Sequence, residues 1–275
     1  MSKRARTKGS GTVVRRMNEG RGKGRGASYQ PWIKIHDLGS RGLSARMKSL
    51  LNGRTHHLLS KLESDWVHAF YALPGLVDLR EQVPLDLEET TVIAQQLGIR
   101  HPTDPRTQEL CVVTTDVVLT CADGSTKVET AVAIKQSADL ASRRNLEKLE
   151  IERVFWSARK IRWLVLTEQE LPHALVKNMK WLKRHLDLPE SGEVSKELIV
   201  RIRAVMEPII KQGNSSLVEV TTRCDDHLGL PPGRALCVAR HLIGSGEWPI
   251  DLSVEIEPQK PLHLISKQSK CEIAA

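Results

Sequence analysis

The sequence lacks any apolar segment long enough to cross a bilayer. None of its hydrophobic runs approaches the ~20 residues of a membrane-spanning helix. Its opening residues, MSKRARTKGSG, contain no apolar stretch of secretory length. The five cysteines are scattered, and no two of them form a CxxC pair. We therefore expect a cytoplasmic protein that is held together by neither disulfides nor zinc.

Acidic residues are nearly missing from the first 26 positions, where Glu19 is the only one. The whole chain carries a formal net charge of +8. An excess of cations favours a polyanionic partner such as DNA or RNA, although many basic proteins never bind nucleic acid. We interpret residues 1–26 as a flexible basic tail that adds non-specific affinity for DNA. The cations that would contact phosphates there are Arg15, Arg16, Arg21, Lys23 and Arg25.

Residues 27–167 are predicted to form an α/β domain, a mixed sheet flanked by helices. Apolar residues recur at helical spacing over 56–71, 87–97 and 140–159, and strand-like runs cover 76–85, 110–121, 127–135 and 161–167. Asp123-Gly124 between two Val- and Thr-rich runs predicts a hairpin. The alternation over 76–85 predicts a strand with one wet face.

Residues 168–275 are predicted to form a separate, winged-helix-like interaction domain. Helical patterns cover 168–186, 194–212, 216–228 and 232–243, and the last two resemble a helix–turn–helix. Two β-like runs, 248–256 and 261–265, would then form a small hairpin.

Three residues of the α/β domain could together hydrolyse a phosphodiester. Asp116 lies in the middle of a predicted strand, where a carboxylate is costly unless a charged group is bound there. The hairpin brings it near Ala133 and Lys135, and a metal-bound carboxylate beside an ammonium suits this chemistry. A strand Asp and a strand Lys are common by themselves. Glu63, on the polar flank of the first helix, adds the second carboxylate that a hard divalent cation prefers.

The segments around these residues resemble one family within the PD-(D/E)xK, restriction-endonuclease-like fold. Through roughly residues 13–190 their order and spacing are similar to those of the TnsA family, the endonuclease subunits of heteromeric transposases. The segments that carry the resemblance are NEGRGKGRG, YQPWI, GRTHHLLSKLE, VDLREQVPL, LGIRHP, TTDVVLTCADG, AVAIK and LEKLEIERVFW.

The resemblance implies a role for each matching position. Glu63 and Asp116 match side-chain ligands of Mg²⁺, and Lys135 matches the catalytic lysine. The backbone carbonyl of Ile134 would complete the oxygen shell of the metal. Glu152 matches a glutamate near the site and would have a supporting role. Mn²⁺ would be an acceptable substitute for Mg²⁺.

Ala133 departs from the family pattern, which has a polar Gln or an acid two positions before the lysine. An alanine supplies no side-chain ligand, so the number of metal ions, one or two, stays open. Glu129 shares the strand face but lies four residues away, more than ~12 Å along a strand. His56-His57 is not expected to hold one metal, because adjacent residues of a helix point in different directions.

The resemblance implies a DNA-associated bacterial enzyme that hydrolyses one strand at the 5′ ends of a transposon during cut-and-paste transposition. A DDE-type, TnsB-like transposase would cut the other strand and join the ends. An AAA+, TnsC-like regulator would engage the C-terminal domain. Two alternatives stay open: a stand-alone restriction or repair nuclease, and a DNA-binding regulator with an inactive nuclease core. Ala133 favours the regulator, and the presence of Glu63, Asp116 and Lys135 together favours an enzyme.

Overall fold

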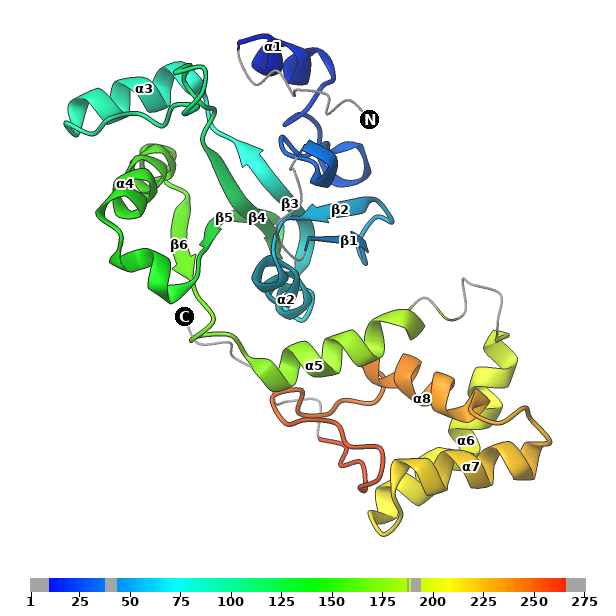
Figure 1. Ribbon diagram of the computed structural model, residues 1–275. Helices are drawn as coiled ribbons and strands as arrows, with labels where there is room; N and C mark the ends of the chain where they lie inside the picture. Colours follow the sequence, from blue (N-terminus) through cyan, green and yellow to red (C-terminus); the bar gives the residue numbers. More distant parts are fainter. Residues whose placement is uncertain (1–9, 38–43, 187, 189–193, 266–275) are drawn as a thin grey trace, which may run out of the picture. The chain divides into compact units, whose positions relative to one another are not determined.

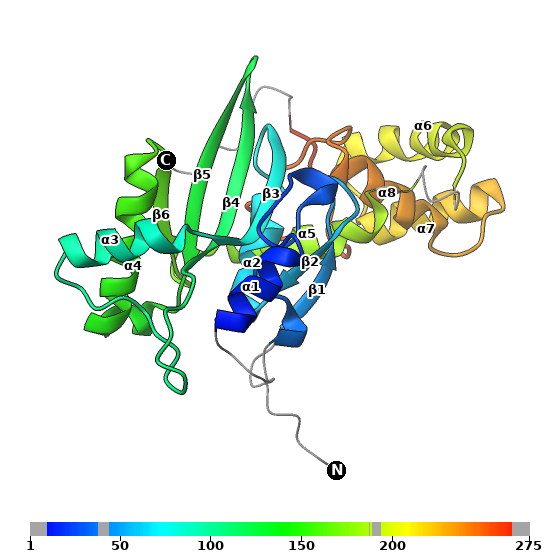
Figure 2. The ribbon, with the colours of Figure 1, turned by 90° about the horizontal axis from the view of Figure 1, so that it is seen from above.

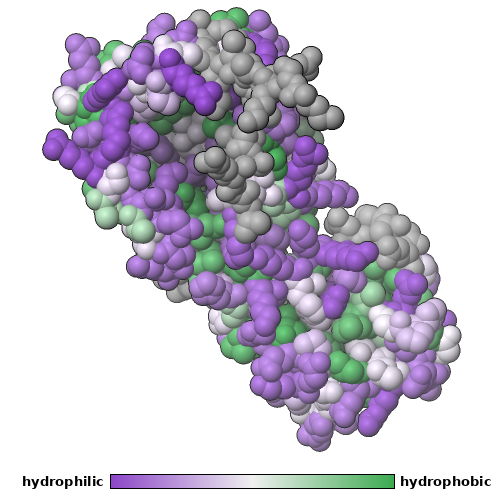
Figure 3. Space-filling view, viewed as in Figure 1, coloured by the Kyte–Doolittle hydropathy of each residue, from purple (hydrophilic) through white to green (hydrophobic). Residues whose placement is uncertain are grey.

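The computed structural model describes residues 10–37, 44–186, 188 and 194–265 (Figure 1). The chain divides into two compact units, Met1–Leu171 and Pro172–Ala275, each with its own core. In the part of the chain that is described, no helix combines the length and the apolar character needed to traverse a bilayer. On the face seen in Figure 3, hydrophilic side chains predominate and apolar ones form small, scattered patches.

A four-stranded mixed sheet in the order β3-β4-β5-β6 is the centre of the first unit. Its strands are β3 (Leu76–Pro84), β4 (Thr114–Asp123), β5 (Thr126–Ile134) and β6 (Arg162–Leu166). The pairs β3–β4 and β4–β5 are antiparallel, and β6 runs parallel to β5. The predicted Asp-Gly hairpin is confirmed, since Asp123 pairs with Thr126 and Gly124 has a φ of +58°.

Helices flank this sheet, as the sequence predicted. They are α2 (Lys61–Phe70), α3 (Leu87–Gln96) and α4 (Arg143–Ala158), the last preceded by a short 3₁₀ turn, Ser137–Ala141. In both Figure 1 and Figure 2, α3 and α4 lie together on one flank of the sheet. They pack on it through apolar residues of the helices and of β3, β4 and β5, among them Ile93, Ala94, Val83, Val118, Ala131, Ile151, Phe155 and Trp156.

The helix predicted from residue 56 begins five residues later. Residues Thr55–Leu58 form strand β2, which pairs with β1 (Ala45–Lys48) in a two-stranded ribbon. Ser60 is the N-cap of α2: its backbone is extended, with φ −141°, and its side chain accepts a hydrogen bond from the Glu63 amide. Because this cap sets the start of the helix, His56 and His57 belong to a strand, and His56 is completely buried.

Residues 10–26, predicted to be part of a flexible tail, are folded onto the first unit, whereas residues 1–9 lie outside the described residues. Ser10–Asn18 form helix α1, followed by 3₁₀ turns at Gly26–Ser28 and Ile35–Asp37. Arg21 is buried and forms ion pairs with Glu19 and Asp37. Arg16 lies 3.5 Å from Asp37 and stacks over Trp32.

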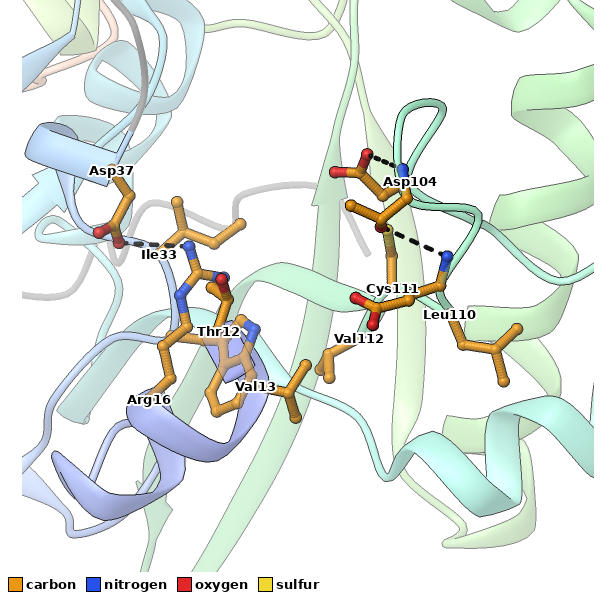
Figure 4. Close-up of a pocket in the computed structure, with 12 residues that line it drawn as sticks. Thr12, Val13, Arg16, Ile33, Asp37, Asp104, Leu110, Cys111 and Val112 are labelled. Carbon is orange, nitrogen blue, oxygen red and sulfur yellow. Dashed lines mark hydrogen bonds and ion pairs between the residues drawn. The ribbon is translucent and has the colours of Figure 1, made fainter. Parts of the chain in front are cut away.

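These internal partners make Arg16 and Arg21 poor phosphate contacts, while Arg15, Lys23 and Arg25 remain exposed. Figure 4 shows Arg16 directed towards Asp37, at one side of a cavity of about 210 Å³. The other side of this cavity is formed by the loop that contains Asp104 and Cys111. The prediction of a wholly flexible tail was therefore wrong, because its charges find partners within the fold.

The four predicted helices of the second unit are present. They are α5 (His173–Leu182, continued by a 3₁₀ turn, Lys183–His185), α6 (Lys196–Gln212), α7 (Leu217–Leu228) and α8 (Arg234–Gly244). The buried carboxylate of Asp225 near the end of α7 accepts hydrogen bonds from the amides of Gly233 and Ala235 at the start of α8, 2.7 Å each. Asp225 thus fixes the turn between the two helices.

The hairpin predicted after α8 is absent from the described residues of this unit, which end at residue 265. One backbone hydrogen bond joins the two runs, from the Ile265 amide to the Pro249 carbonyl, while the carbonyls of Pro258 and Lys260 accept from the first turn of α7. The amide side chain of Asn178 in α5 donates to the carbonyls of Leu252 and Val254 and accepts from the amide of Ile256. Because these groups are satisfied by a helix side chain, no strand ladder forms, and the prediction of a wing was wrong.

Candidate active site

Glu63 lies in the first turn of α2 and is buried, with a relative exposure of 6%. Its carboxylate accepts a hydrogen bond from the Leu59 amide at 2.9 Å and from the Ser60 hydroxyl at 3.0 Å. A solvated glutamate on a helix surface would have no such contacts. The N-terminal cap therefore holds this carboxylate in one orientation beside the sheet.

Asp116 of β4 meets Lys135 at the end of β5. The Lys135 ammonium lies 2.6 Å from Oδ2 of Asp116, and the Ile134 amide donates to the same oxygen at 2.8 Å. Within an extended strand the amide and the carbonyl of one residue point to the same neighbour. The carbonyl of Ile134 is therefore directed to the Asp116 side of β5, where the sequence analysis expected a metal ligand.

Glu152 of α4 is the third carboxylate near Lys135. It has a relative exposure of 4% and accepts a hydrogen bond of 3.0 Å from the indole of Trp163. Burial, with the charge of Asp116 as a second cause, raises the pKa of both Glu63 and Glu152 to about 7. Burial alone would lower the pKa of Lys135, but the neighbouring Asp116 raises it. The site thus holds more buried acid than its single ammonium can neutralise.

This surplus of negative charge fits a divalent cation. The available donors are carboxylate and carbonyl oxygens, the ligands that Mg²⁺ and Mn²⁺ prefer. Among the described residues, no group of three or more His, Cys, Asp or Glu side chains is arranged to hold a metal ion. The candidate metal position therefore depends on two carboxylates, Glu63 and Asp116, together with the Ile134 carbonyl. Ala133, which is completely buried, adds no ligand.

Gln82 of β3 is a residue of this site that the sequence analysis missed. It has a relative exposure of 2%, and its amide nitrogen lies 3.4 Å from the Glu63 carboxylate. A polar residue within the VDLREQVPL segment was interpreted as part of a wet strand face. The only sequence signal for a different role is that Glu81 and Gln82 are adjacent polar residues, which a strict alternation does not allow.

Both of these polar residues of β3 are buried, so the prediction of one wet face was wrong. Arg54 binds both oxygens of the Glu81 carboxylate, at 2.9 and 2.5 Å. His56 lies 2.8 Å from the same carboxylate and contacts the Tyr71 hydroxyl with its other ring nitrogen. Glu81 therefore anchors the β1–β2 ribbon to the sheet, while Gln82 contacts Glu63. A buried polar residue is compatible with a strand when its polar atoms have hydrogen-bond partners, as those of Glu81 do.

We expect Glu63→Gln to stabilise the metal-free protein at pH 8. Folding raises the pKa of Glu63 from its ordinary value of ~4.5 to about 7. Between these two pH values Glu63 is protonated in the folded protein and ionised in the unfolded chain, so the folded protein loses stability as the pH rises through this window. Glutamine removes that cost, and we expect a gain of about 1–2 kcal/mol at pH 8. Thermal unfolding with a chelator at pH 8 and pH 5 would measure it. An equal effect at both pH values would contradict this explanation.

Comparison with known proteins identifies the family of this chain. A family model described as the N-terminal part of TnsA-like endonucleases matches residues 74–168, and one described as the C-terminal part of TnsA endonuclease matches residues 170–252. The chain is 33% identical over 234 residues to the Transposon Tn7 transposition protein TnsA of Escherichia coli. This similarity covers 85% of the chain and 83% of the relative. The chain therefore belongs to the TnsA family of transposition endonucleases.

Proposed function

We propose that this protein is the subunit that hydrolyses one DNA strand at the 5′ ends of a transposon, with Mg²⁺ as its cofactor, during cut-and-paste transposition. The observation that supports this most directly is the convergence of Glu63, Asp116 and Lys135. They lie in α2, in β4 and directly after β5, and the first two are buried carboxylates. Mn²⁺ would replace Mg²⁺, since both take oxygen ligands.

Each residue of the site has a distinct task in this reaction. Glu63 and Asp116, with the Ile134 carbonyl, would hold the cation. The bound cation would polarise the phosphate and lower the pKa of a water molecule. Lys135, held by Asp116, is placed to donate to the attacking water or to the developing charge on the phosphate. Glu152, fixed by Trp163, supports the charge balance around Lys135.

The partners in this proposal are transposon-end DNA, a DDE-type transposase like TnsB and an AAA+ regulator like TnsC. The relative in Escherichia coli is named as a transposition protein, which supports an assembly of this kind. We assign binding of the AAA+ regulator to the second unit. The two arginines of α8 that could read bases are Arg234 and Arg240, but the Arg240 guanidinium stacks on Trp181, 4.1 Å from the ring centre. This stacking leaves α8 with little capacity for sequence recognition.

Accordingly, we expect isolated residues 168–275 to bind DNA weakly, with steep salt dependence and no preferred sequence. The same fragment should bind the AAA+ regulator, and its removal should prevent recruitment of the nuclease. Electrophoretic mobility shifts at several salt concentrations and footprinting on transposon ends would check this. A defined footprint of the fragment at physiological salt would contradict it and make the second unit a reader of the ends.

A cleavage assay tests the proposed function as a whole. The full chain, the partner transposase and end-labelled transposon DNA are combined with Mg²⁺, with Ca²⁺ or with a chelator, and both strands are mapped. We expect cuts at the 5′ ends only when Mg²⁺ and the partner are present. Cleavage without a partner would indicate a stand-alone nuclease. If DNA binding is retained but no cleavage occurs under any condition, the result would favour the alternative that Ala133 suggests, a DNA-binding regulator with an inactive nuclease core.

A further inference from the structure

Gln82 has a backbone conformation that is unusual for its residue type. It lies within strand β3, yet its φ is +50°, in the left-handed region that residues other than glycine and asparagine rarely adopt. Such a conformation persists only where the surrounding structure determines it, and it is most common at functional sites. Because Gln82 is also almost completely buried, its position is specified on all sides.

The segment that follows α1 holds this backbone in place. The Trp32 amide donates to the Gln82 carbonyl at 3.1 Å, and the Tyr29 hydroxyl donates to the neighbouring Glu81 carbonyl at 3.0 Å. The same segment lies directly against the end of β3, because a Cβ atom on Gly22 would approach the Pro84 ring to 2.2 Å. The N-terminal residues therefore brace the peptide on which the Gln82 side chain is carried.

The Gln82 side chain lies between Glu63 of the site and Thr114 at the start of β4. Its amide nitrogen donates to Oε2 of Glu63, and its oxygen accepts from the Thr114 hydroxyl, both at 3.4 Å. Gln82 lies between the register pairs Glu81–Val117 and Val83–Thr115, so continuing the register sets position 82 across from Asp116. Continued one residue past Val117–Val132, the β4–β5 register sets Asp116 across from Ala133, whose side chain is only a methyl group.

We propose that Gln82 is a positioning residue for Glu63, an inference that rests on the proposed metal-dependent function. Its amide N–H keeps the Glu63 carboxylate turned towards Asp116, so that both carboxylates can coordinate the same cation. The Leu59 amide donates to the same Oε2 from the helix side. Partners that orient a metal-ligating group in this way commonly change metal affinity 10- to 100-fold when they are removed.

The test measures Mn²⁺ binding to the full chain without DNA, by electron paramagnetic resonance of the free ion. Gln82→Met keeps the length of the side chain but has no donor. Gln82→Asn keeps the amide and tolerates a positive φ, but it is one methylene too short to reach Glu63. We expect both variants to bind Mn²⁺ about tenfold more weakly than wild type and to unfold within a few degrees of it. Gln96→Met, on the exposed end of α3, is the matched control and should bind like wild type.

The possible outcomes separate this inference from the proposed function. If wild type binds Mn²⁺ and both Gln82 variants bind it equally well, the positioning role is wrong and the metal site stands. Unfolding of both variants would show that Gln82 is a structural residue, which also overturns the role. If wild type binds no Mn²⁺ while remaining folded, the metal-dependent function fails, and this inference fails with it.

Discussion

Lys135→Ala should abolish cleavage of transposon ends, with a loss of at least about 10²–10³-fold in rate. The ammonium lies 2.6 Å from Asp116 and close to Glu63 and Glu152, so its removal takes away the proton donor that would stabilise the charge developing on the phosphate. Asp116→Asn should cause a loss of similar size, because it weakens metal binding while preserving the shape of the side chain. The assay is strand cleavage with the partner transposase and Mg²⁺, measured on denaturing gels.

Lys127→Ala is the matched control for this experiment. Lys127 lies near the start of β5, the strand that ends just before Lys135, and it is exposed at the hairpin end. We therefore expect its removal to leave the cleavage rate unchanged. Circular dichroism and partner binding should remain normal in all three variants. Wild-type cleavage by either Lys135→Ala or Asp116→Asn would show that the reaction takes place elsewhere on the chain.

The largest effect on stability should follow from Arg54→Met. Arg54 and Glu81 form a bidentate pair whose side chains are only 7% and 0% exposed. Removing the guanidinium leaves the buried carboxylate with only His56 and the His57 amide as partners among those that the structure describes. We expect the free energy of unfolding to fall by about 3–5 kcal/mol. Urea unfolding of the full chain measures this change, and hydrogen exchange in β3 and β4 reports the first unit alone.

An exposed pair that is also bidentate provides the control. Arg153 binds both oxygens of Glu150 at 2.7 Å, but these side chains are 50% and 37% exposed. Arg153→Met should therefore cost less than about 1 kcal/mol. Equal losses in the two variants would show that burial of the Arg54 pair is not what makes it important.

The pH dependence gives a second check on the buried pair. Burial alone would raise the pKa of Glu81, but the hydrogen bonds from Arg54 and His56 outweigh it and lower this pKa to about 2. A carboxyl group whose pKa is lowered by folding stabilises the folded protein at every pH above its ordinary pKa. This contribution disappears as the pH falls from the ordinary pKa towards about 2. The difference in the free energy of unfolding between wild type and Arg54→Met should become smaller over the same pH range.

Local sequence signals determined most of the secondary structure. The Asp123-Gly124 turn, the apolar periods of α3 and α4 and the helices of the second unit each depend on residues close in sequence. The identity of the catalytic candidates also came from sequence, through several segments in register with one family. For these features, local propensity and the tertiary structure agree.

Tertiary contacts decided the remainder, and in each case a polar group had a distant partner. Arg21 is buried because Asp37 lies beside it, and Glu81 is buried because Arg54 and His56 reach it from the β1–β2 ribbon. Asn178 satisfies the backbone of the segment that was predicted to form a wing. A hydrophobic pattern assigns every charged or amide side chain to solvent, so it cannot anticipate such pairs.

Gln82 shows most clearly how local sequence and tertiary contacts act together on one residue. Sequence alone placed it on a strand, and that was correct. Only the folded chain shows that its φ is positive, that the Trp32 amide holds its carbonyl and that its side chain meets Glu63. The backbone angle of one residue is set by contacts fifty or more positions away in sequence, whereas its tendency to form a strand is set by its neighbours. The sequence by itself therefore determined which elements and which acids the site uses, and the tertiary structure determined which polar side chains hold those acids in place.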